Sequence, residues 1–532
     1  MKSLLTLFLL FQISLSYKIL IFVPSVSQNN VNLFARLGNV LVAAGHNVTL
    51  YRPHYSDLAE LEPSGACQEI RVAGMVDREK MAEFERFQTI NAYEDSGLFS
   101  DSNAKFIRLA KELMAEACEV QITNKEVLTT LKAQQFDLAI ANMYEACSFG
   151  IIRLLQIPTY IWMSSGVLVE HMAWSMGVPA PPSYVPVTSL GRNDRMRYTK
   201  RMQNFVTYQI AHFALPRLIQ PQTAAFRKHF GMDFPDLNQL ASQSPLVFVN
   251  SEELLDFPRP ILHKVVYIGG IGIEKPKPLK RDFQTLMDQS KSGVIVVCFG
   301  SAVNSSHMPL EWKKALLRTI SKMPDYTFVL KYEYNDIREM AEAKTLHNFY
   351  IFSWLPLVDL LANPRTKLLI THGGRWGIMD AAYTGTPIAC LPLYGDQFYN
   401  CKAANRQGLG VVLKKKKMHS STLIIEKLNR VLRNDSYQLT ARKIARMLAK
   451  KPVKPETLAV RWTEFVAEFK TLPNLEPMAP RLGILQYLCL DVLAGIGVVL
   501  FIALFVAWKL FVCVVKKLRS CLFGKSDKKK AE

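Results

Sequence analysis

Short apolar runs alternate with stretches of helical periodicity along most of the chain. In the first half, apolar runs at residues 18–24 and 48–51 flank a stretch with apolar positions at helical spacing, 33–45, and further runs follow at 136–141 and 159–163. A buried strand reads as a continuous apolar run, whereas an amphipathic helix shows a period of about 3.6 residues. The pattern predicts repeated strand-helix-strand units, which build parallel sheets.

The second half repeats this pattern. Apolar runs at residues 294–300, 326–332, 367–371 and 387–393 alternate with helical stretches. The part of the chain before its last long apolar stretch has roughly 470 residues, which is too long for one hydrophobic core and suits two domains. We therefore predict two α/β domains, with the boundary near residues 242–250, where an apolar run begins a strand.

Both ends of the chain carry patterns related to membranes. Residues 1–16 combine one lysine with a short apolar run and small residues at their end, which predicts a cleaved secretory signal. Residues 488–515 are long and apolar enough to cross a bilayer, and the basic segment 516–532 that follows is expected in the cytoplasm. This predicts a single-pass membrane protein of type I whose larger part lies in the lumen.

Charge and cysteine content exclude two classes of protein. The formal net charge is +20, but Lys and Arg are dispersed and no base-reading motif accompanies them, so we expect no nucleic-acid partner. Nine cysteines in 532 residues are too few for a disulfide scaffold. The lumen permits disulfides, but the sequence does not reveal which cysteines pair.

The most informative stretch runs from residue 367 to residue 397. An apolar strand is followed by the turn His372-Gly373-Gly374, a helix-like stretch, a second apolar run and the pair Asp396-Gln397. In doubly wound sheets, ligands bind beyond the strand ends and phosphates lie at helix N-termini. Glycines let backbone N–H groups approach an anion, and a histidine can donate to a phosphate oxygen. The stretch therefore predicts a nucleotide site.

The spacing of this stretch resembles a known signature. From Thr371-His372 through Asp380, Pro387 and Pro392 to Asp396-Gln397, it resembles that of the UDP-glycosyltransferases, and specifically the animal membrane-bound UDP-glucuronosyltransferase type. The resemblance covers the mature chain from the first strand to the tail. It implies the GT-B architecture, in which two Rossmann-like domains face each other, here with one C-terminal transmembrane helix.

The resemblance also implies a division of labour between the domains. The N-terminal domain would bind the acceptor, the second domain would bind the UDP-sugar, and helices after it would pack back on the first. With the signal at 1–16, the predicted bounds are 17–245, 246–440, 441–485 for these helices and the linker, 488–515 for the span and 516–532 for the cytosolic tail.

The resemblance assigns most of the donor site. Trp354 would stack on the uracil ring, Ser301 would donate to a phosphate oxygen, and Arg259 would lie near the diphosphate or the sugar. Asp380 would meet the ribose, and the last two residues of the signature would hold sugar hydroxyls. The donor residues are Arg259, Ser301, Trp354, His372, Gly373, Gly374, Gly377, Asp380, Asp396 and Gln397.

The chain departs from the family pattern at several donor positions. Leu357 stands where the family has a glutamine that reads the uracil edge, and Trp376 replaces a small or polar residue beside the diphosphate. Asp380 is one methylene shorter than the usual glutamate. The scheme implies no metal and no cofactor, with the UDP-sugar as co-substrate, because the histidine, the serine and the helix N-terminus would stabilise the departing diphosphate.

The acceptor side departs further. In the family, a histidine at the start of the first helix takes the proton from the acceptor, and an acidic residue orients it. Asn30 occupies the histidine position and Asn142 the acidic one, and an asparagine cannot accept a proton at neutral pH. Glu145 and His171 are possible substitutes, although a pocket-lining or structural role for His171 is the simpler interpretation.

Three hypotheses follow. The first is an inverting transferase that moves a hexose or hexuronic acid from UDP-glucose or UDP-glucuronate to small lipophilic acceptors, with amines, thiols and acidic phenols favoured by the missing base. The second is a weak or silent UDP-sugar-binding membrane protein that modulates active relatives, as part of a homo- or hetero-oligomer. The third is a transferase directed to lipids or polysaccharides.

The location follows from the same segments. Lys529 and Lys530 resemble a dilysine retrieval signal of the endoplasmic reticulum, although basic tails also end in lysines for solubility. We therefore expect the endoplasmic reticulum membrane, with the catalytic part in the lumen. Of the glycosylation sequons at Asn47, Asn304 and Asn434, the last is the best candidate because the others lie in a predicted strand and in a donor-site loop.

Overall fold

The computed structural model describes most of the chain. Several predicted features lie outside the described residues: nearly all of the signal segment, Ser301, the sequon at Asn304, and Lys529 and Lys530. The chain divides into two compact units, Met1–Glu476 and Pro477–Glu532. The described residues are 16–24, 28–55, 65–72, 74, 76–94, 100–300, 305–333 and 336–523.

The first domain is built on a seven-stranded sheet, in which all neighbouring strands pair in parallel. The strand order is β3-β2-β1-β4-β5-β6-β7, so the first strand lies between the second and the fourth. The strands are β1 (Lys18–Phe22), β2 (Asn47–Pro53), β3 (Gln68–Val72), β4 (Leu138–Asn142), β5 (Tyr160–Ser164), β6 (Leu246–Val249) and β7 (Val265–Tyr267).

The second domain repeats this topology in a six-stranded parallel sheet, with the order β10-β9-β8-β11-β12-β13. Both sheets therefore reverse their strand order between two central strands, which is the doubly wound arrangement of dinucleotide-binding folds. The strands are β8 (Gly293–Cys298), β9 (Tyr326–Lys331), β10 (Phe349–Phe352), β11 (Thr366–Thr371), β12 (Ile388–Cys390) and β13 (Gly410–Val412).

Each sheet is buried on both faces. In β1, Leu20 and Phe22 belong to one hydrophobic core, whereas Ile19 and Ile21 belong to another on the opposite face. In β8, alternate residues divide between two cores in the same way. A strand covered on both faces needs apolar residues at every position, which explains the continuous apolar runs of the sequence. The predicted α/β class with two Rossmann-like domains is confirmed.

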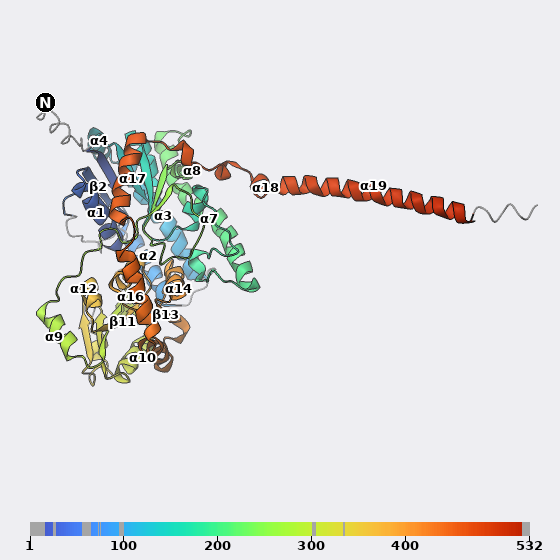
Figure 1. Cartoon of the computed structure of the whole chain (residues 1–532). Helices are drawn as coiled ribbons and strands as arrows, with labels where there is room; N and C mark the ends of the chain where they lie inside the picture. Colours follow the sequence, from blue (N-terminus) through green and yellow to red (C-terminus); the bar gives the residue numbers. More distant parts are fainter. Residues whose placement is uncertain are drawn as a thin grey trace, which may run out of the picture. The chain divides into compact units, whose positions relative to one another are not determined.

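Helices connect the strands and cover the sheets (Figure 1). In the first domain they are α1 (Gln28–Ala43), α2 (Arg78–Tyr93), α3 (Asp101–Thr123), α4 (Lys125–Ala133), α5 (Cys147–Leu155), α6 (Glu170–Ser175), α7 (Tyr198–Phe230) and α8 (Leu237–Ser242). In the second they are α9 (Arg281–Gln289), α10 (Leu310–Ser321), α11 (Asp336–Glu339), α12 (Leu357–Ala362), α13 (Arg375–Thr384), α14 (Gln397–Arg406) and α15 (Ser421–Leu432).

The boundary between the domains differs from the prediction. β6 and β7, which the bounds 17–245 and 246–440 assign to the second domain, extend the first sheet, because β6 pairs with β5 and β7 pairs with β6. The assignment of residues 246–267 was therefore wrong. A short apolar run predicts a strand, but its sequence does not say which sheet the strand joins.

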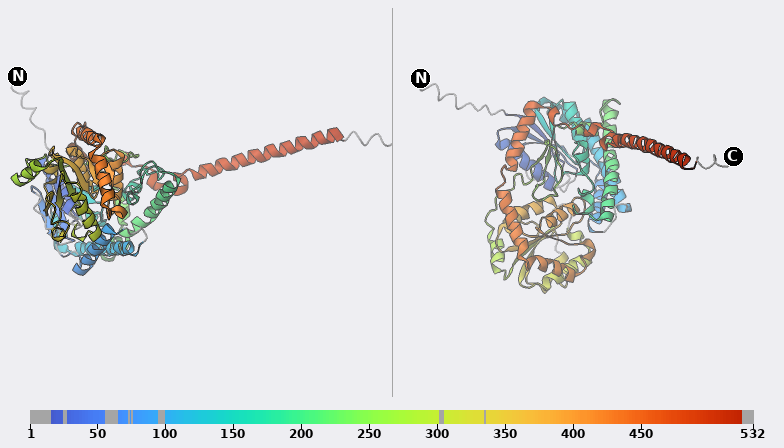
Figure 2. Two further views of the ribbon diagram at one scale, coloured as in Figure 1. Left: turned by 90° about the horizontal axis from the view of Figure 1, so that it is seen from below. Right: turned by 45° about the vertical axis from the view of Figure 1, so that its right-hand side comes forward.

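Two helices follow the second sheet, and the second of them returns to the first domain. α16 (Asp435–Ala449) packs on α13, and α17 (Pro455–Phe469) packs on α1 and β5. Figure 2 shows the pair following one side of both domains. The Oγ1 atom of Thr159 donates a hydrogen bond to the carbonyl of Lys470, with 2.6 Å between the oxygens. The end of α17 is thereby held at the start of β5.

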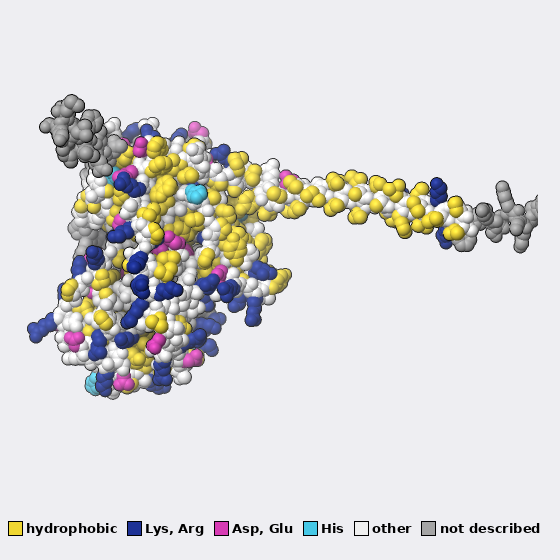
Figure 3. All heavy atoms as spheres, in the orientation of Figure 1, with side chains coloured by type: hydrophobic (Ala, Val, Ile, Leu, Met, Phe, Trp, Pro, Cys, Tyr) yellow, Lys and Arg dark blue, Asp and Glu magenta, His cyan; other side chains and the backbone are white. Residues whose placement is uncertain are grey.

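The second unit contains one long apolar helix, α19 (Leu490–Phe523), which follows the short α18 (Ile484–Tyr487). Thirty-four residues of helix span about 50 Å, and about 20 apolar residues suffice for the hydrocarbon core of a bilayer. Apolar side chains cover the helix surface in Figure 3. The helix fits a membrane anchor, and it continues through Lys516, Lys517 and Arg519, beyond the predicted end of the span at residue 515, because basic residues do not end a helix.

Two disulfides join cysteines that sequence analysis could not pair. Cys118 of α3 is bonded to Cys147 at the start of α5, and Cys390 of β12 is bonded to Cys401 of α14. Both bonds lie in the first unit. Each connects segments that flank the site described next.

Candidate active site

The two sheets present their topological switch points as binding regions. In the first sheet, the order reverses between β1 and β4, and in the second between β8 and β11. Loops at the carboxyl ends of such strands diverge and leave a crevice in which ligands bind. The residues that follow β4 and β11 are therefore the first candidates for ligand binding and catalysis.

The turn after β11 has a geometry that suits an anion. β11 ends at Thr371, and α13 begins at Arg375, so the three residues between them form the whole turn. Gly373 has φ 88°, and a Cβ atom there would lie 2.4 Å from Sγ of Cys401. Only glycine fits this position. The free backbone N–H groups at the start of α13 favour a phosphate.

His372 lies between two glycines of this turn region. A Cβ on Gly300 would lie 2.6 Å from its Cε1 atom, and a Cβ on Gly374 would lie 2.5 Å from its Nε2 atom. Burial, together with the charge of Lys331, lowers the pKa of His372 to about 4, so the ring is neutral at physiological pH. Its buried Nδ1 atom has no hydrogen-bond partner among the described residues. A buried nitrogen without a protein partner is suited to a hydrogen bond with a ligand oxygen.

Trp354 follows β10 and precedes α12. Its side chain is 67% exposed, so it is not a core tryptophan. An exposed indole offers a flat apolar face on which a base can stack. The expected contact with uracil stays a prediction, and Leu357, which replaces the family's glutamine, is the first residue of α12.

Asp380 lies in the second turn of α13 and is nearly buried. Burial raises the pKa of its carboxyl to about 7, and Arg36 of α1 opposes this shift. The guanidinium of Arg36 also lies 4.7 Å from the centre of the Trp376 ring. A residue of the first domain therefore reaches the α13 end of the donor region. Gly377 lies on the neighbouring turn, where a Cβ would come within 3.0 Å of Oγ1 of Thr371.

The pair Asp396-Gln397 lies at the start of α14. The Oδ2 atom of Asp396 accepts a hydrogen bond from Nδ2 of Asn400 at 3.0 Å, and burial raises the pKa of this carboxyl. Oε1 of Gln397 accepts from the backbone N–H groups of Leu393 and Tyr394, at 2.9 and 3.1 Å. The carbonyl of the glutamine therefore holds its own loop. Its predicted contact with the sugar would use the amide nitrogen.

Two arginines that both act on Tyr267 have buried nitrogens without partners among the described residues, and one of them, Arg375, also acts on Asp396. Arg375 is 95% buried and donates from Nη2 to Oδ1 of Asn400 at 2.6 Å, while its Nε has no partner among the described residues. Arg259 donates from Nη1 to the carbonyl of Leu168 at 2.9 Å, and its Nε and Nη2 atoms are likewise buried without a partner in the described part of the chain. Arg375 was not among the predicted residues, although an arginine in the first turn of a helix predicted to bind an anion is itself a signal.

The N-terminal domain meets the same site through Asn30. Asn30 is a nearly buried residue of α1 that hydrogen-bonds the hydroxyl of Tyr144, and Ser165 donates to that hydroxyl at 2.6 Å. Asp396 is close by, because its Oδ2 atom lies 3.2 Å from where a Cβ on Gly166 would be. Asn30 is thus placed at the junction of the predicted acceptor and sugar sites.

The other candidates on this side occupy different places. Asn142 ends β4 and accepts hydrogen bonds from the N–H groups of Tyr144 and Glu145, at 2.8 and 3.2 Å, so it organises its own loop. The ring of His171 on α6 packs edge-on against Trp162 with centroids 5.7 Å apart. Burial lowers the pKa of His171 to about 4, which makes it a poor base near neutral pH.

Solved structures share this two-domain arrangement. A glycosyltransferase of kitacinnamycin superposes with a TM-score of 0.57 at 14% identity, covering 85% of this chain and 99% of its own. The spinosyn rhamnosyltransferase SpnG gives 0.54 at 16% identity, with 84% and 100% covered. The fold is therefore the GT-B fold of glycosyltransferases.

Sequence comparison gives the family. The family model described as UDP-glucoronosyl and UDP-glucosyl transferase matches residues 18–529, and the chain belongs to this family of enzymes, which transfer sugars from UDP-sugars. The putative UDP-glucuronosyltransferase ugt-48 of Caenorhabditis elegans is 29% identical over 93% of this chain and 94% of its own length. Mouse UDP-glucuronosyltransferase 1A7 is 30% identical over 79% and 77%. Human UDP-glucuronosyltransferase 1A9 matches equally well, so the animal type predicted from the signature is confirmed.

Proposed function

We propose that the enzyme transfers glucuronic acid from UDP-glucuronate to small lipophilic acceptors. The observation that carries the choice of sugar is Arg375, whose buried Nε lacks a partner in the described structure and whose charge acts on Asp396. Asp396 suits sugar hydroxyls, and a neighbouring guanidinium suits the carboxylate that distinguishes glucuronate from glucose. The name UDP-glucuronosyltransferase carried by the relatives supports the same choice.

The proposed reaction inverts the anomeric centre. The acceptor attacks the anomeric carbon in line with the bond to the diphosphate, so an α-linked donor gives a β-linked product and UDP. His372 and the start of α13 stabilise the charge that develops on the diphosphate. Ser301, which lies outside the described residues, would add a further donor. The scheme needs no metal and no cofactor.

The proposed acceptor class follows from a cavity beyond β1 and β4. The cavity has a volume of about 40 Å³ and holds a few atoms, which suits the reacting end of an acceptor. The described residues of its walls are apolar apart from one carboxyl and two tyrosine hydroxyls, which favours a lipophilic molecule. The lining residues are Pro24, Tyr55, Val76, Met81, Phe84, Ala110, Leu113, Met114, Tyr144 and Glu145. An active enzyme is favoured over a silent UDP-sugar-binding protein by the family and by relatives named as UDP-glucuronosyltransferases.

We further propose that the enzyme works on the luminal side of the endoplasmic reticulum membrane. Disulfides are typical of oxidising compartments, and both disulfides belong to the first unit. The basic residues at the end of α19 are expected on the cytoplasmic side. In the lumen, Asn434 would be open to glycosylation, because it is exposed at the start of α16.

Replacing Arg375 by glutamine tests the choice of sugar. We expect kcat/KM with UDP-glucuronate to fall by about 10- to 100-fold, because a charged hydrogen bond contributes about 1.5–3 kcal/mol. The value with UDP-glucose should change little, and R375K should recover part of the loss. The matched control is R318Q on the exposed face of α10. An equal loss with both sugars would assign Arg375 to the diphosphate and contradict the choice of glucuronate.

A further inference from the structure

Among the described residues, one buried carboxyl faces the apolar cavity of the first domain. Glu145 follows β4, lines the cavity and is 6% exposed. Burying a carboxyl in an apolar wall costs stability unless a partner compensates its charge, so such a residue is often retained for a function. Within the described part of the chain, no Lys or Arg is among the groups that act on it.

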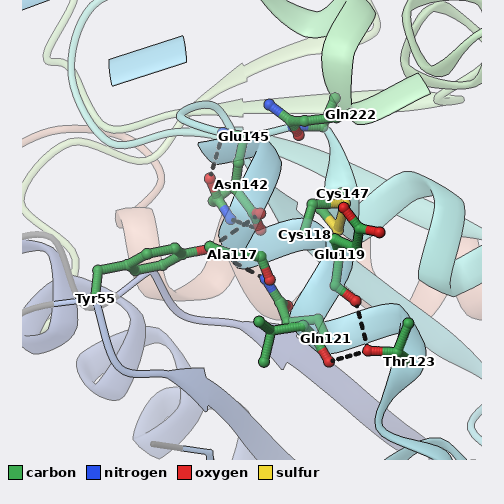
Figure 4. Close-up of a disulfide and its surroundings, with 12 residues drawn as sticks. Tyr55, Ala117, Cys118, Glu119, Gln121, Thr123, Asn142, Glu145, Cys147 and Gln222 are labelled. Carbon is green, nitrogen blue, oxygen red and sulfur yellow. Dashed lines mark hydrogen bonds between the residues drawn. A yellow bond between two sulfur atoms is a disulfide. The ribbon is translucent and has the colours of Figure 1, made fainter. Parts of the chain in front are cut away.

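Neutral groups from three elements hold this carboxyl in place. The hydroxyl of Tyr55, which follows β2, donates to Oε2 at 3.1 Å, and Nδ2 of Asn142 at the end of β4 donates to Oε1 at 3.3 Å. Gln121 of α3 supports the arrangement by donating to the hydroxyl of Tyr55 at 3.3 Å. Figure 4 shows these side chains gathered around Glu145. These hydrogen bonds orient the carboxyl without an ion pair.

The loop that carries Glu145 is also fixed covalently. Cys147, two residues further on, is bonded to Cys118 of α3, the helix that also supplies Gln121 (Figure 4). Between them, the backbone N–H of Ala146 donates to Oε1 of Gln222 at 3.0 Å. A short loop that is bonded on one side and follows a central strand on the other is a rigid support. Such support is what a reacting group requires.

The protonation of Glu145 suits proton transfer. Burial raises the pKa of the carboxyl to about 7, against the hydrogen bonds from Asn142, Tyr55 and Gln121, which favour the ionised form. Among the described residues, the titratable groups that face it are Tyr55 and Tyr51, whose pKa values burial raises, so both stay neutral. A base is most effective when its pKa lies near the working pH. Both forms of Glu145 are then populated near neutrality.

The cavity that Glu145 lines extends to Tyr144, whose hydroxyl lies near the sugar site. Tyr144, the preceding residue, lines the same cavity, and its hydroxyl is held by Asn30 and Ser165. The charge of Asp396 acts on that hydroxyl, which places the cavity end beside the proposed sugar-binding carboxylate. An acceptor in the cavity can therefore present its reacting atom between the two. Asn30, which cannot serve as a base, would position Tyr144 instead.

We propose that Glu145 is the general base of the transfer and accepts the proton of the acceptor. This inference rests on the proposed function. As the oxygen or nitrogen of the acceptor forms its bond to the anomeric carbon, the bond from that carbon to the diphosphate breaks, and UDP leaves with the electron pair. The proton of the acceptor moves to the carboxylate of Glu145 and then to solvent. No oxidant, reductant or further reactant is involved.

The test compares two phenols on the full-length protein in detergent micelles. One phenol is weakly acidic and neutral at the assay pH, and the other is acidic enough to be ionised. With E145Q, we expect kcat/KM for the neutral phenol to fall by about 10²–10⁴-fold, because that is the usual contribution of a general base. The ionised phenol needs no base and should lose far less. E145D, which keeps the carboxyl, should recover part of the activity on the neutral phenol.

The pH profile gives a second readout that a structural role would not move. In the wild-type protein, kcat/KM for the neutral phenol should rise through pH of about 7, where Glu145 ionises, and E145Q should lack this rise. The matched control is E119Q on α3, since Glu119 is paired on the surface with Lys228 and His229. It should behave as wild type.

Two results separate this inference from the proposed function. If wild type forms no conjugate from either phenol with either sugar, the proposed function fails. If wild type forms conjugates and E145Q loses the same factor on both phenols, with the pH profile unchanged, Glu145 is not the base while the transferase stands. Binding of UDP, measured by calorimetry on the same preparations, shows whether the donor domain of each variant is intact.

Discussion

Replacing Asp396 by asparagine is expected to lower kcat/KM by about 100-fold or more without lowering the melting temperature. The activity falls because a carboxylate gives sugar hydroxyls charged hydrogen bonds, which contribute about 1.5–3 kcal/mol each. An asparagine retains one acceptor and adds a donor that competes with the sugar. Binding of UDP alone should change little, because Asp396 faces the sugar in this account.

The stability of this variant follows from the sign of the pKa shift. Burial raises the pKa of Asp396 in the folded protein, so the folded state binds the proton more tightly than the unfolded state. The stability that this group contributes then decreases as the pH rises from its ordinary range through the folded pKa. At neutral pH, the buried ionised carboxyl destabilises the folded state. The D396N substitution removes this charge, and Asn400 can still donate a hydrogen bond to the amide oxygen of the new side chain. Equal or higher thermal stability is the expected result.

Differential scanning fluorimetry and steady-state kinetics on one preparation test this pair of effects. D325N is the control, since Asp325 is an exposed residue before β9, and it should change neither quantity. A D396N protein that melts well below wild type would show that the carboxylate stabilises the fold. If the D396N variant keeps wild-type activity, Asp396 does not bind the sugar.

Replacing Gly373 by alanine is expected to abolish measurable transfer and to destabilise the protein. The new Cβ would lie 2.4 Å from Sγ of Cys401 and 2.9 Å from Sγ of Cys390, on a backbone with φ 88°. Overpacking costs about 1–3 kcal/mol, and the left-handed conformation costs about 1–2 kcal/mol more for a residue with a Cβ. The sulfurs are bonded to each other and cannot move apart freely, so the turn and its anion-binding N–H groups must shift.

The matched control is G395A. Gly395 also has a positive φ, 58°, but a Cβ there would meet no atom within 4 Å. This variant isolates the backbone cost of about 1–2 kcal/mol, without overpacking. Denaturant unfolding should therefore rank wild type above G395A and G395A above G373A, and only G373A should lose UDP binding. Equal losses in the two variants would mean that the contact with the disulfide is unimportant.

The sequence predicted the fold best where strands are buried on both faces. The runs that became β1, β8 and β11 are continuous because apolar residues are needed on every side of a covered strand. β3, β7, β10 and β13 were missed. β3 has a partly exposed polar pattern, and the other three have only three or four residues each. The sheet to which β6 belongs was assigned wrongly, because strand pairing depends on contacts that are distant in sequence.

The parts of the site that are formed by residues close together in the sequence could be predicted. The turn at His372 could be read because glycines, a histidine and a helix start are neighbours in the sequence. The disulfide beneath Gly373, the unpaired nitrogens of Arg375 and the contacts of Glu145 with Tyr55 depend on how remote segments pack. No local pattern encodes these distances. The roles assigned to the individual donor residues stay predictions.

The central claim is that this protein transfers glucuronic acid to a lipophilic acceptor with inversion. The most direct test incubates the purified full-length protein with α-linked UDP-glucuronate and a phenol, with mass spectrometry to detect the conjugate and proton NMR to assign its anomeric configuration. We expect a β-glucuronide and UDP in equal amounts, with product strongly reduced in D396N. An α-linked product would contradict inversion, and the absence of any conjugate from intact, UDP-binding protein would contradict the transfer itself.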